Sequence, residues 1–215
     1  MGTVAILKEI SLLIGIWVAI YGVDSWRREH KGKRQMELAE QTLALFYEAS
    51  DVIAYIRNIF SYISETEGIA RGENETEERY EARKQASIIF KRYNENQELF
   101  NKIHAMRYRF MAQIGKNQAE PFEELRKIVN EIFVSARMLS QLWSRRHFRT
   151  QDQEDKHYKS IKRHEAIFYE GIEEEDPIIP RLKKLVSEIE VTCNAIISGK
   201  GTLHGFFNRP LGKRD

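Results

Sequence analysis

The sequence has little of what interrupts a helix or cross-links a fold. It contains one cysteine, four prolines and twelve glycines in 215 residues. A single thiol cannot form an internal disulfide, and we expect Cys193 to be a buried apolar side chain in a reducing compartment. Long stretches without proline or glycine are rich in Glu, Lys, Arg, Ile and Ala, which favours long helices. The sequence therefore predicts an all-α protein.

The sequence also lacks an excess of charge of one sign and any useful run of alternating polar and apolar residues. Lys and Arg number 34 against 32 Asp and Glu, so the formal net charge is only +2. Such a balance does not by itself imply a polyanionic partner. The absence of alternation disfavours strands, and no repeat is visible at the periods of solenoid proteins.

The motifs that carry common chemistries are missing from the sequence. It has no His-Glu-x-x-His zinc motif, no Gly-x-Gly-x-x-Gly or Gly-Lys-Ser/Thr phosphate loop, and no serine nucleophile elbow. Glu154, His157 and His164 can share one helix face, but a di-iron bundle needs the Glu-x-x-His pair twice and two further carboxylates. A solvated charged face is the simpler interpretation. We therefore predict no catalytic residue, no metal ligand and no cofactor.

The N-terminal segment is the one long apolar run. Residues 10–23 carry no charge, and Val4 to Leu7 extend the run past Lys8 and Glu9. Twenty residues from Val4 to Val23 match the ~30 Å of a bilayer's hydrocarbon layer at 1.5 Å per residue. Lys8 lies near the outer end, where a long side chain can extend to the interface, whereas Glu9 fits less well. The sequence predicts a membrane-anchor helix at residues 1–26.

The residues after this run are those expected at a cytosolic membrane interface. An aromatic side chain is followed closely by five basic ones. The predicted membrane-interface residues are Trp26, Arg27, Arg28, Lys31, Lys33 and Arg34. Lys and Arg are retained on the cytosolic side of a single span, so we expect the N-terminus outside and the body in the cytosol. Membrane lipid is thus the first predicted partner.

Other interpretations of the N-terminal segment compete with a membrane span. A cleaved signal peptide needs a basic start and a cleavage site between small residues, whereas this start is neutral and the helical pattern continues. Myristoylation at Gly2 needs Ser or Thr at position six, which is Ile6. A hydrophobic helix buried in a bundle or in an oligomer remains the main alternative.

The body, residues 27–198, shows helical spacing of apolar residues and predicts an antiparallel helical bundle. Two rows of residues seven apart form a seam that fits packing inside the bundle or self-association as a short coiled coil. These rows are Phe46, Ile53 and Phe60, and Ala49, Ile56 and Ile63. Further helices are expected at 77–114, 121–143, 150–171 and 177–199, with an acidic loop at 64–78 and a basic flexible tail at 199–215.

The strongest local concentration of charge in the body is basic, and it includes aromatic residues. This possible anionic-ligand face comprises Arg145, Arg146, Arg149, Lys156, Lys159, Lys162 and Arg163. Basic residues interleaved with aromatics can bind RNA or single-stranded DNA. They can equally meet acidic lipids or remain solvated. A nucleic-acid binder or an enzyme using Arg145–Arg163 is therefore the alternative function.

The order of these segments resembles a known organisation. A short apolar N-terminal segment, then Trp26-Arg27-Arg28, then a helical body, is similar to bacterial single-span membrane proteins with a helical cytosolic domain. The resemblance brings no catalytic residue. Together with the anchor, it indicates a membrane-tethered helical interaction or scaffold module, with self-association or a protein partner as its expected activity.

Overall fold

The described part of the chain is helical throughout. The computed structural model describes residues 2–144, 147–172 and 175–199, with side chains from residue 11 onward. Within these ranges there are no strands, which confirms the predicted all-α class. The helices are α1 (Gly2–Ile56), α2 (Glu77–Glu95), α3 (Gln97–Gln113), α4 (Glu120–Leu142), α5 (Gln151–Phe168) and α6 (Ile179–Ile197), with 3₁₀ turns at Ile63–Glu65 and Lys116–Ala119.

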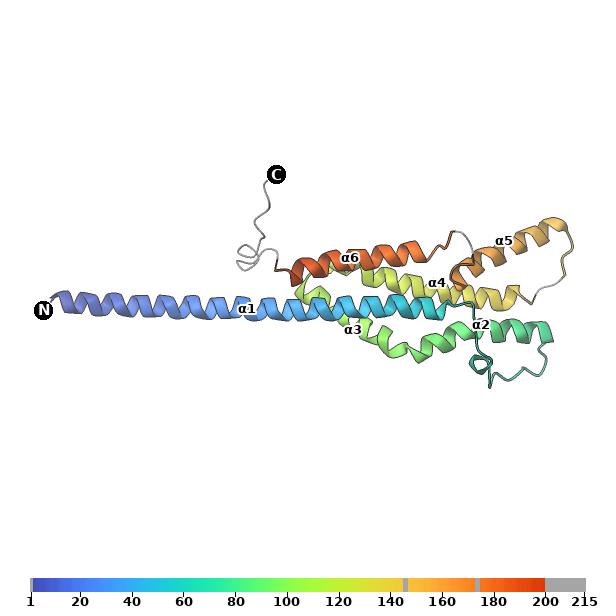
Figure 1. The fold of residues 1–215 in the computed structure, drawn as a ribbon, viewed down its shortest axis with the longest axis horizontal. Helices are drawn as coiled ribbons and strands as arrows, with labels where there is room; N and C mark the ends of the chain where they lie inside the picture. Colours follow the sequence, from blue (N-terminus) through green and yellow to red (C-terminus); the bar gives the residue numbers. More distant parts are fainter. Residues whose placement is uncertain (1, 145–146, 173–174, 200–215) are drawn as a thin grey trace, which may run out of the picture.

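Helix α1 is the longest element and belongs to two environments. Its 55 residues extend for about 82 Å at 1.5 Å per residue. The N-terminal half projects beyond the other helices, and the C-terminal half lies among them (Figure 1). From residue 11 onward, where the side chains of α1 are described, Leu38 is the first that is fully buried. Gly32 does not interrupt the helix, so the predicted anchor and the bundle share one continuous backbone.

Crossing a bilayer requires a helix that is both long and apolar. Among the residues that the structure describes, no helix combines sufficient length with sufficient hydrophobicity to span a bilayer. The predicted span starts at Val4, and the side chains of its first seven residues, 4–10, fall outside the described ones.

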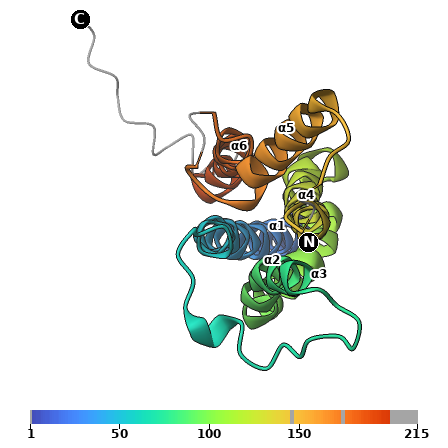
Figure 2. The ribbon, with the colours of Figure 1, turned by 90° about the vertical axis from the view of Figure 1, so that its right-hand side faces the viewer.

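The bundle alternates in direction along the chain. α1 runs away from the N-terminus, α2 and α3 return, α4 runs outward again, and α5 and α6 return (Figure 1). Viewed end-on, α1 lies between α6 on one side and the α2–α3 pair on the other (Figure 2). α1 packs on α3 and α6, and α4 packs on α2, α5 and α6. This is the expected antiparallel arrangement.

The core lies where the apolar stripes of α1, α3, α4 and α6 meet. Phe46 of α1 contacts the ring of Phe122 in α4 edge-on, with centroids 4.9 Å apart, and Phe110 of α3 adds a third ring at 5.3 Å from Phe122. Cys193 of α6 is fully buried in the same core, and this burial raises the pKa of its thiol to about 11. The prediction of a buried structural cysteine is confirmed.

The structure corrects two helix boundaries. α1 ends at Ile56, so Phe60 and Ile63 do not continue the seam and are more than 80% exposed in the following loop. The predicted 77–114 helix is two helices that break at Asn96, whose side-chain amide donates to the Arg92 carbonyl oxygen at 2.9 Å. Asparagine competes in this way for backbone partners and favours helix ends.

Four side chains of the predicted seam pack inside this chain's own bundle. Phe46, Ala49, Ile53 and Ile56 are all buried in the core of this single chain. Intramolecular packing covers these four side chains, so they are not on the surface of this chain for self-association through the Phe46–Ile63 seam. The bundle-packing interpretation of the same spacing is the one that holds.

Candidate functional site

The predicted interface residues lie on the part of α1 that leaves the bundle. One face of the helix carries two adjacent rows with i, i+4, i+8 spacing, so their side chains are neighbours on the helix surface. These rows are Trp26, His30 and Arg34, and Arg27, Lys31 and Gln35. Arg28 and Lys33 flank this face on its two sides by the same periodicity, and neither lines the hollow described next. The structure thus divides the predicted cluster in two.

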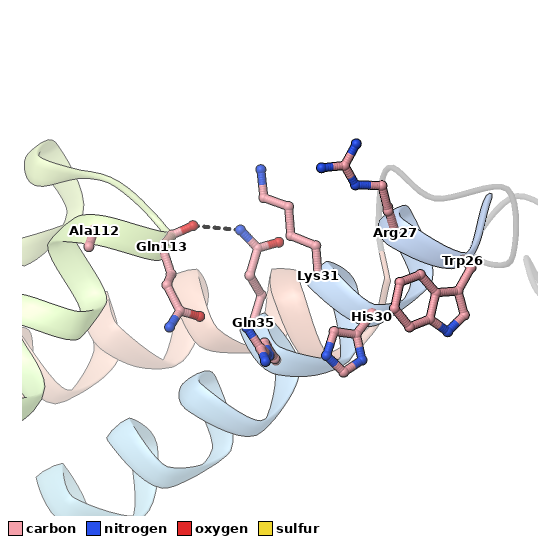
Figure 3. A pocket seen from close by; sticks show the side chains of 8 residues that line it. Trp26, Arg27, His30, Lys31, Gln35, Ala112 and Gln113 are labelled. Atoms are coloured by element: carbon pink, nitrogen blue, oxygen red, sulfur yellow. Dashed lines mark hydrogen bonds between the residues drawn. The ribbon is translucent and has the colours of Figure 1, made fainter. Parts of the chain in front are cut away.

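A hollow of about 410 Å³ lies along this face, where α1 passes the end of α3. Figure 3 shows its eight lining side chains, which come from both helices. They are Trp26, Arg27, His30, Lys31, Arg34, Gln35, Ala112 and Gln113. We call this feature the α1–α3 pocket. Its volume lies within the range of ordinary small-molecule sites, which is roughly 300–1,000 Å³.

One hydrogen bond joins the two walls of the pocket. The side-chain Nε2 of Gln35 donates to the backbone oxygen of Gln113 at 2.5 Å (Figure 3). Gln113 is the last residue of α3, where carbonyl oxygens have no partner within the helix. Gly115 follows with φ of +147°, which favours glycine, as expected of the predicted stop. The wall formed by α3 therefore has a fixed position against α1.

The basic residues that line the pocket and those beside it differ in their pairing. Arg28, which does not line the pocket, donates to Asp24 at 3.0 Å. Arg27, Lys31 and Arg34 form no ion pair with any residue in the described part of the chain. The lining of the α1–α3 pocket also contains no carboxylate. The pocket is consequently a concentrated positive region open to an anion.

Toward the N-terminus, α1 displays apolar side chains on every side. Leu12 and Trp17 are each 66% exposed, and Trp17 stacks on Tyr21 with centroids 5.6 Å apart. All of the following are at least half exposed: Leu12, Leu13, Ile14, Ile16, Trp17, Val18, Ile20, Tyr21 and Val23. A helix that is apolar all round is normally covered by protein or lipid. The bundle does not cover it, which excludes burial within this chain's own described core.

The predicted anionic-ligand face lies mainly on α5. Arg145 and Arg146 fall in one of the gaps between the described ranges. Arg149, Lys156, Lys159, Lys162 and Arg163 are exposed, and Lys156 pairs with Asp152 at 2.6 Å. Asp152, Glu154 and Asp155 lie among these cations on the same helix. The structure therefore places four of these basic residues on α5 and Arg149 just before it, but with acidic residues between them.

The histidines of α5 are used in packing. His157 is buried and lies against the ring of Phe148, and His164 shares a hydrogen bond of 3.1 Å between its Nδ1 and the buried Ser135 hydroxyl. Burial, and then the charge of Arg163, lower the pKa of His164 below its ordinary value. Across the residues that could be searched, no group of His, Cys, Asp or Glu is placed to hold a metal ion.

A second exposed feature lies at the other end of α1, where no sequence pattern predicted an exposed apolar surface. The loop after Ile56 presents Phe60, Tyr62 and Ile63, which are 82%, 79% and 84% exposed. We call these three residues the distal apolar loop. Nothing in the seven-residue spacing of Phe60 and Ile63 distinguished them from core residues, because the helix was expected to continue through them.

The backbone of this loop is held by one buried arginine. Arg92 of α2 donates to the carbonyl oxygens of Asn58 at 2.7 Å and Phe60 at 2.6 Å, and to both carboxylate oxygens of Glu65 at 2.6 and 3.0 Å. The hydrogen bond from Arg92 lowers the pKa of Glu65 against the opposing effect of burial. Such charge-assisted bonds fix the loop in one conformation.

A second buried arginine closes the same end of the bundle. Arg57 donates to the carbonyl oxygens of Ala166, Ile167 and Tyr169, at the end of α5, and to Asp176 at 2.7 Å. Burial alone would raise the pKa of Asp176, but the hydrogen bonds that it accepts from Arg57 and from backbone amides keep that pKa low. These bonds satisfy carbonyl oxygens at the end of α5 that have no partner within the helix.

Comparisons with protein-family models, with curated proteins and with solved structures found no match for this chain.

Proposed function

We propose that this protein is a membrane-tethered helical interaction module. In this proposal the N-terminal part of α1 inserts in a bilayer, the basic residues after it meet the headgroups on the cytosolic side, and the bundle stands in the cytosol. The observation that carries the proposal is the all-round exposure of the apolar side chains from Leu12 to Val23 on a helix that continues without a break into the bundle.

The length of the apolar segment supports insertion. Residues 11–23 alone extend for about 20 Å, which is short of the ~30 Å hydrocarbon layer. The helical backbone of α1 continues to Gly2, and residues 4–10 add about 10 Å. An exposed apolar surface of this kind is otherwise a site of oligomerisation. The alternative is that the same segment of a second copy of the chain covers this surface. Membrane fractionation distinguishes that oligomer from insertion in a bilayer.

The placement of charge supports the orientation. Five basic residues lie between Arg27 and Arg34, directly after the apolar segment. Each contributes about 1 kcal/mol near an anionic leaflet, and such clusters are retained on the cytosolic side. We therefore propose a single-pass protein with its N-terminus outside and its body in the cytosol.

The far end of α1 supports an interaction role. Ile56 lies about 45 Å along the helix from Trp26, so the distal apolar loop stands away from the proposed membrane surface. Exposed aromatic and aliphatic side chains on a fixed backbone are the usual anchors of protein interfaces. Two charged groups, Arg92 and Glu65, are buried to hold this loop. That arrangement supports the distal apolar loop as the partner-binding surface.

The alternative function uses the basic face of α5. Lys156 is paired and acidic residues lie between the cations, an arrangement that weakens the field that steers a nucleic acid. Nucleic-acid binding by the face from Arg149 to Arg163 remains a prediction. Binding to heparin or RNA that falls steeply with added salt is the result that would support it.

Membrane fractionation with matched lysine substitutions tests the proposal. Leu12→Lys with Ile16→Lys places two charges one turn apart in the apolar segment. Val134→Lys with Met138→Lys does the same on partly exposed positions of α4. The first pair should move the protein from the alkali-washed membrane pellet to the supernatant, because a charge at mid-bilayer costs about 3 kcal/mol or more. The second pair should leave it in the pellet.

Two results would overturn the proposal. One is full-length protein that stays in the supernatant without detergent. The other is a mass in solution that is a multiple of 25.3 kDa and falls to the monomer value in the Leu12/Ile16 variant. The second result would assign the apolar segment to an oligomer interface.

A further inference from the structure

We propose that the α1–α3 pocket binds the phosphomonoester headgroup of one membrane lipid. This inference rests on the proposed function, because the headgroup layer must lie beside Trp26 for a lipid to reach the pocket. It goes beyond general attraction to an acidic leaflet, since it assigns one ligand of defined chemistry to a site with named walls.

The first argument is the geometry of the positive charges. Arg27, Lys31 and Arg34 are spaced i, i+4 and i+7, so all three project from one side of α1 into the same hollow. Side chains on a helix lean toward its N-terminus, which here is the direction of the proposed membrane. Three cationic groups on adjacent turns can therefore converge on one phosphate at the headgroup level.

The second argument is that these charges are available. Asp24 pairs with Arg28, which is outside the pocket lining, whereas the ion pairs among described residues leave Arg27, Lys31 and Arg34 unpaired. The lining of the pocket includes no carboxylate that would compete for them. Without a partner in the described part of the chain, these three cations present their charge to an anion that enters the pocket.

The third argument is that the pocket exists before the ligand binds. The bond from Gln35 to the Gln113 carbonyl oxygen holds the end of α3 against α1 at 2.5 Å (Figure 3). Binding to a preformed site costs less ordering than binding to a free helix surface. A basic helix alone would lack the wall formed by Ala112 and Gln113. Without that wall it would not discriminate between different lipid headgroups.

The fourth argument concerns which lipid fits. Trp26 lies at the end of the pocket nearest the apolar segment and stacks on His30, with ring centroids 5.6 Å apart. Tryptophan in such a position favours the boundary between headgroup and acyl chain. A phosphomonoester carries more negative charge than a diester and no ammonium group. Its oxygens accept paired hydrogen bonds from arginine, and nothing on it is repelled by the three cations.

Two substitution pairs of equal charge separate a pocket from diffuse attraction. Lys31→Gln with Arg34→Gln removes one lysine and one arginine from the pocket. Arg28→Gln with Lys33→Gln removes the same two residue types from positions of the same segment that do not line the pocket. Full-length protein in detergent would be mixed with equal amounts of phosphatidic acid and phosphatidylglycerol. Bound lipid would then be counted by native mass spectrometry.

The expected result is one retained phosphatidic acid on the wild-type chain and on the Arg28/Lys33 variant. The Lys31/Arg34 variant should bind it roughly tenfold more weakly, because it loses charge-assisted bonds of more than 1 kcal/mol. Millimolar inorganic phosphate should not displace the lipid, since the free ion lacks contact with the apolar end at Trp26. Alkali-washed membranes should contain all three proteins in equal amounts.

Three outcomes would overturn the inference. Equal losses in both variants would assign the binding to diffuse charge. Equal retention of the two lipids by the wild-type chain would remove the phosphomonoester preference. Displacement by inorganic phosphate would assign the pocket to a soluble anion. Each of these leaves the anchor intact in membrane pellets, so failure of this inference differs visibly from failure of the proposed function.

Discussion

Gln35 and Gln113 lie 78 positions apart, yet the side-chain amide of the first donates to the backbone oxygen of the second at 2.5 Å. This bond connects the end of α3 to the last turn of α1 before the helix enters the bundle. At this bond the projecting part of α1 begins, and the end of α3 is attached to it. The stability of the α3 end should therefore depend on one side chain of α1.

We expect Gln35→Ala to loosen the end of α3 without unfolding the protein. A lost hydrogen bond costs about 1 kcal/mol, so the midpoint of urea unfolding should move only slightly. Amide hydrogen exchange at residues 110–115 should become faster, because opening of this helix end is local. Gln41→Ala, at an exposed position of the same helix, is the matched control and should leave that exchange unchanged. Equal exchange in both variants would show that the bond has no effect on the α3 end.

Phe110 tests the assignment of the core. Its ring is fully buried and contacts Phe122, so Phe110→Ala should lower the free energy of unfolding by about 3–5 kcal/mol through lost packing and a cavity. Tyr108 lies on the same helix and is 56% exposed. Tyr108→Ala should change stability by less than ~1 kcal/mol. Urea unfolding followed by circular dichroism compares the two, and similar losses would contradict the assigned faces of α3.

Particular residues show how far the sequence predicted this architecture. The start of α5 was predictable because Thr150 caps the helix locally. Its hydroxyl accepts a hydrogen bond from the backbone N–H of Gln153 at 3.3 Å. Pro121 likewise marked the first turn of α4. The end of α1 at Ile56 was not predictable, since apolar spacing continued to Ile63 and the turn depends on Arg92 of another helix.

The candidate site was also predictable only where its residues are close together in the sequence. Trp26 and the basic residues after it are neighbours in sequence, so the cluster itself was visible. The division of that cluster by face follows from the helical period, and His30 could have been included by its spacing from Trp26 and Arg34. Ala112 and Gln113 could not, because no local pattern connects them with α1. The distal apolar loop was hidden by its resemblance to a core stripe.

The ion pair between Arg92 and Glu65 should make part of the free energy of unfolding depend on pH in the acid range. Arg92 keeps the pKa of Glu65 below its ordinary value of 4.5. A carboxyl whose folded-state pKa is depressed contributes stability above its unfolded-state pKa, and this contribution is lost as pH falls through the folded-state pKa. Glu65→Gln should therefore be less stable than wild type at pH 7. The difference should shrink as pH is lowered below 4.5.

Urea unfolding at a series of pH values measures this difference. Glu67→Gln, in the same loop but exposed, serves as the control and should match wild type across the series. A Glu65→Gln variant whose deficit does not change with pH would contradict the account of the buried pair. Arg92→Met should be more damaging than either, by about 3–5 kcal/mol, because it leaves Glu65 and the loop carbonyl oxygens without their donor.

The depth of Trp17 in a bilayer tests the central claim most directly. The full-length protein would be reconstituted in bilayers whose acyl chains carry bromine near the middle, and tryptophan fluorescence would be compared with that in unlabelled lipid. Trp17 lies about 5 Å from the centre of the segment 4–23, whereas Trp143 lies in the bundle. The account predicts strong quenching that Trp17→Phe removes and Trp143→Phe leaves in place. Quenching that is absent from the wild-type chain, or that persists in Trp17→Phe, would contradict the membrane tether.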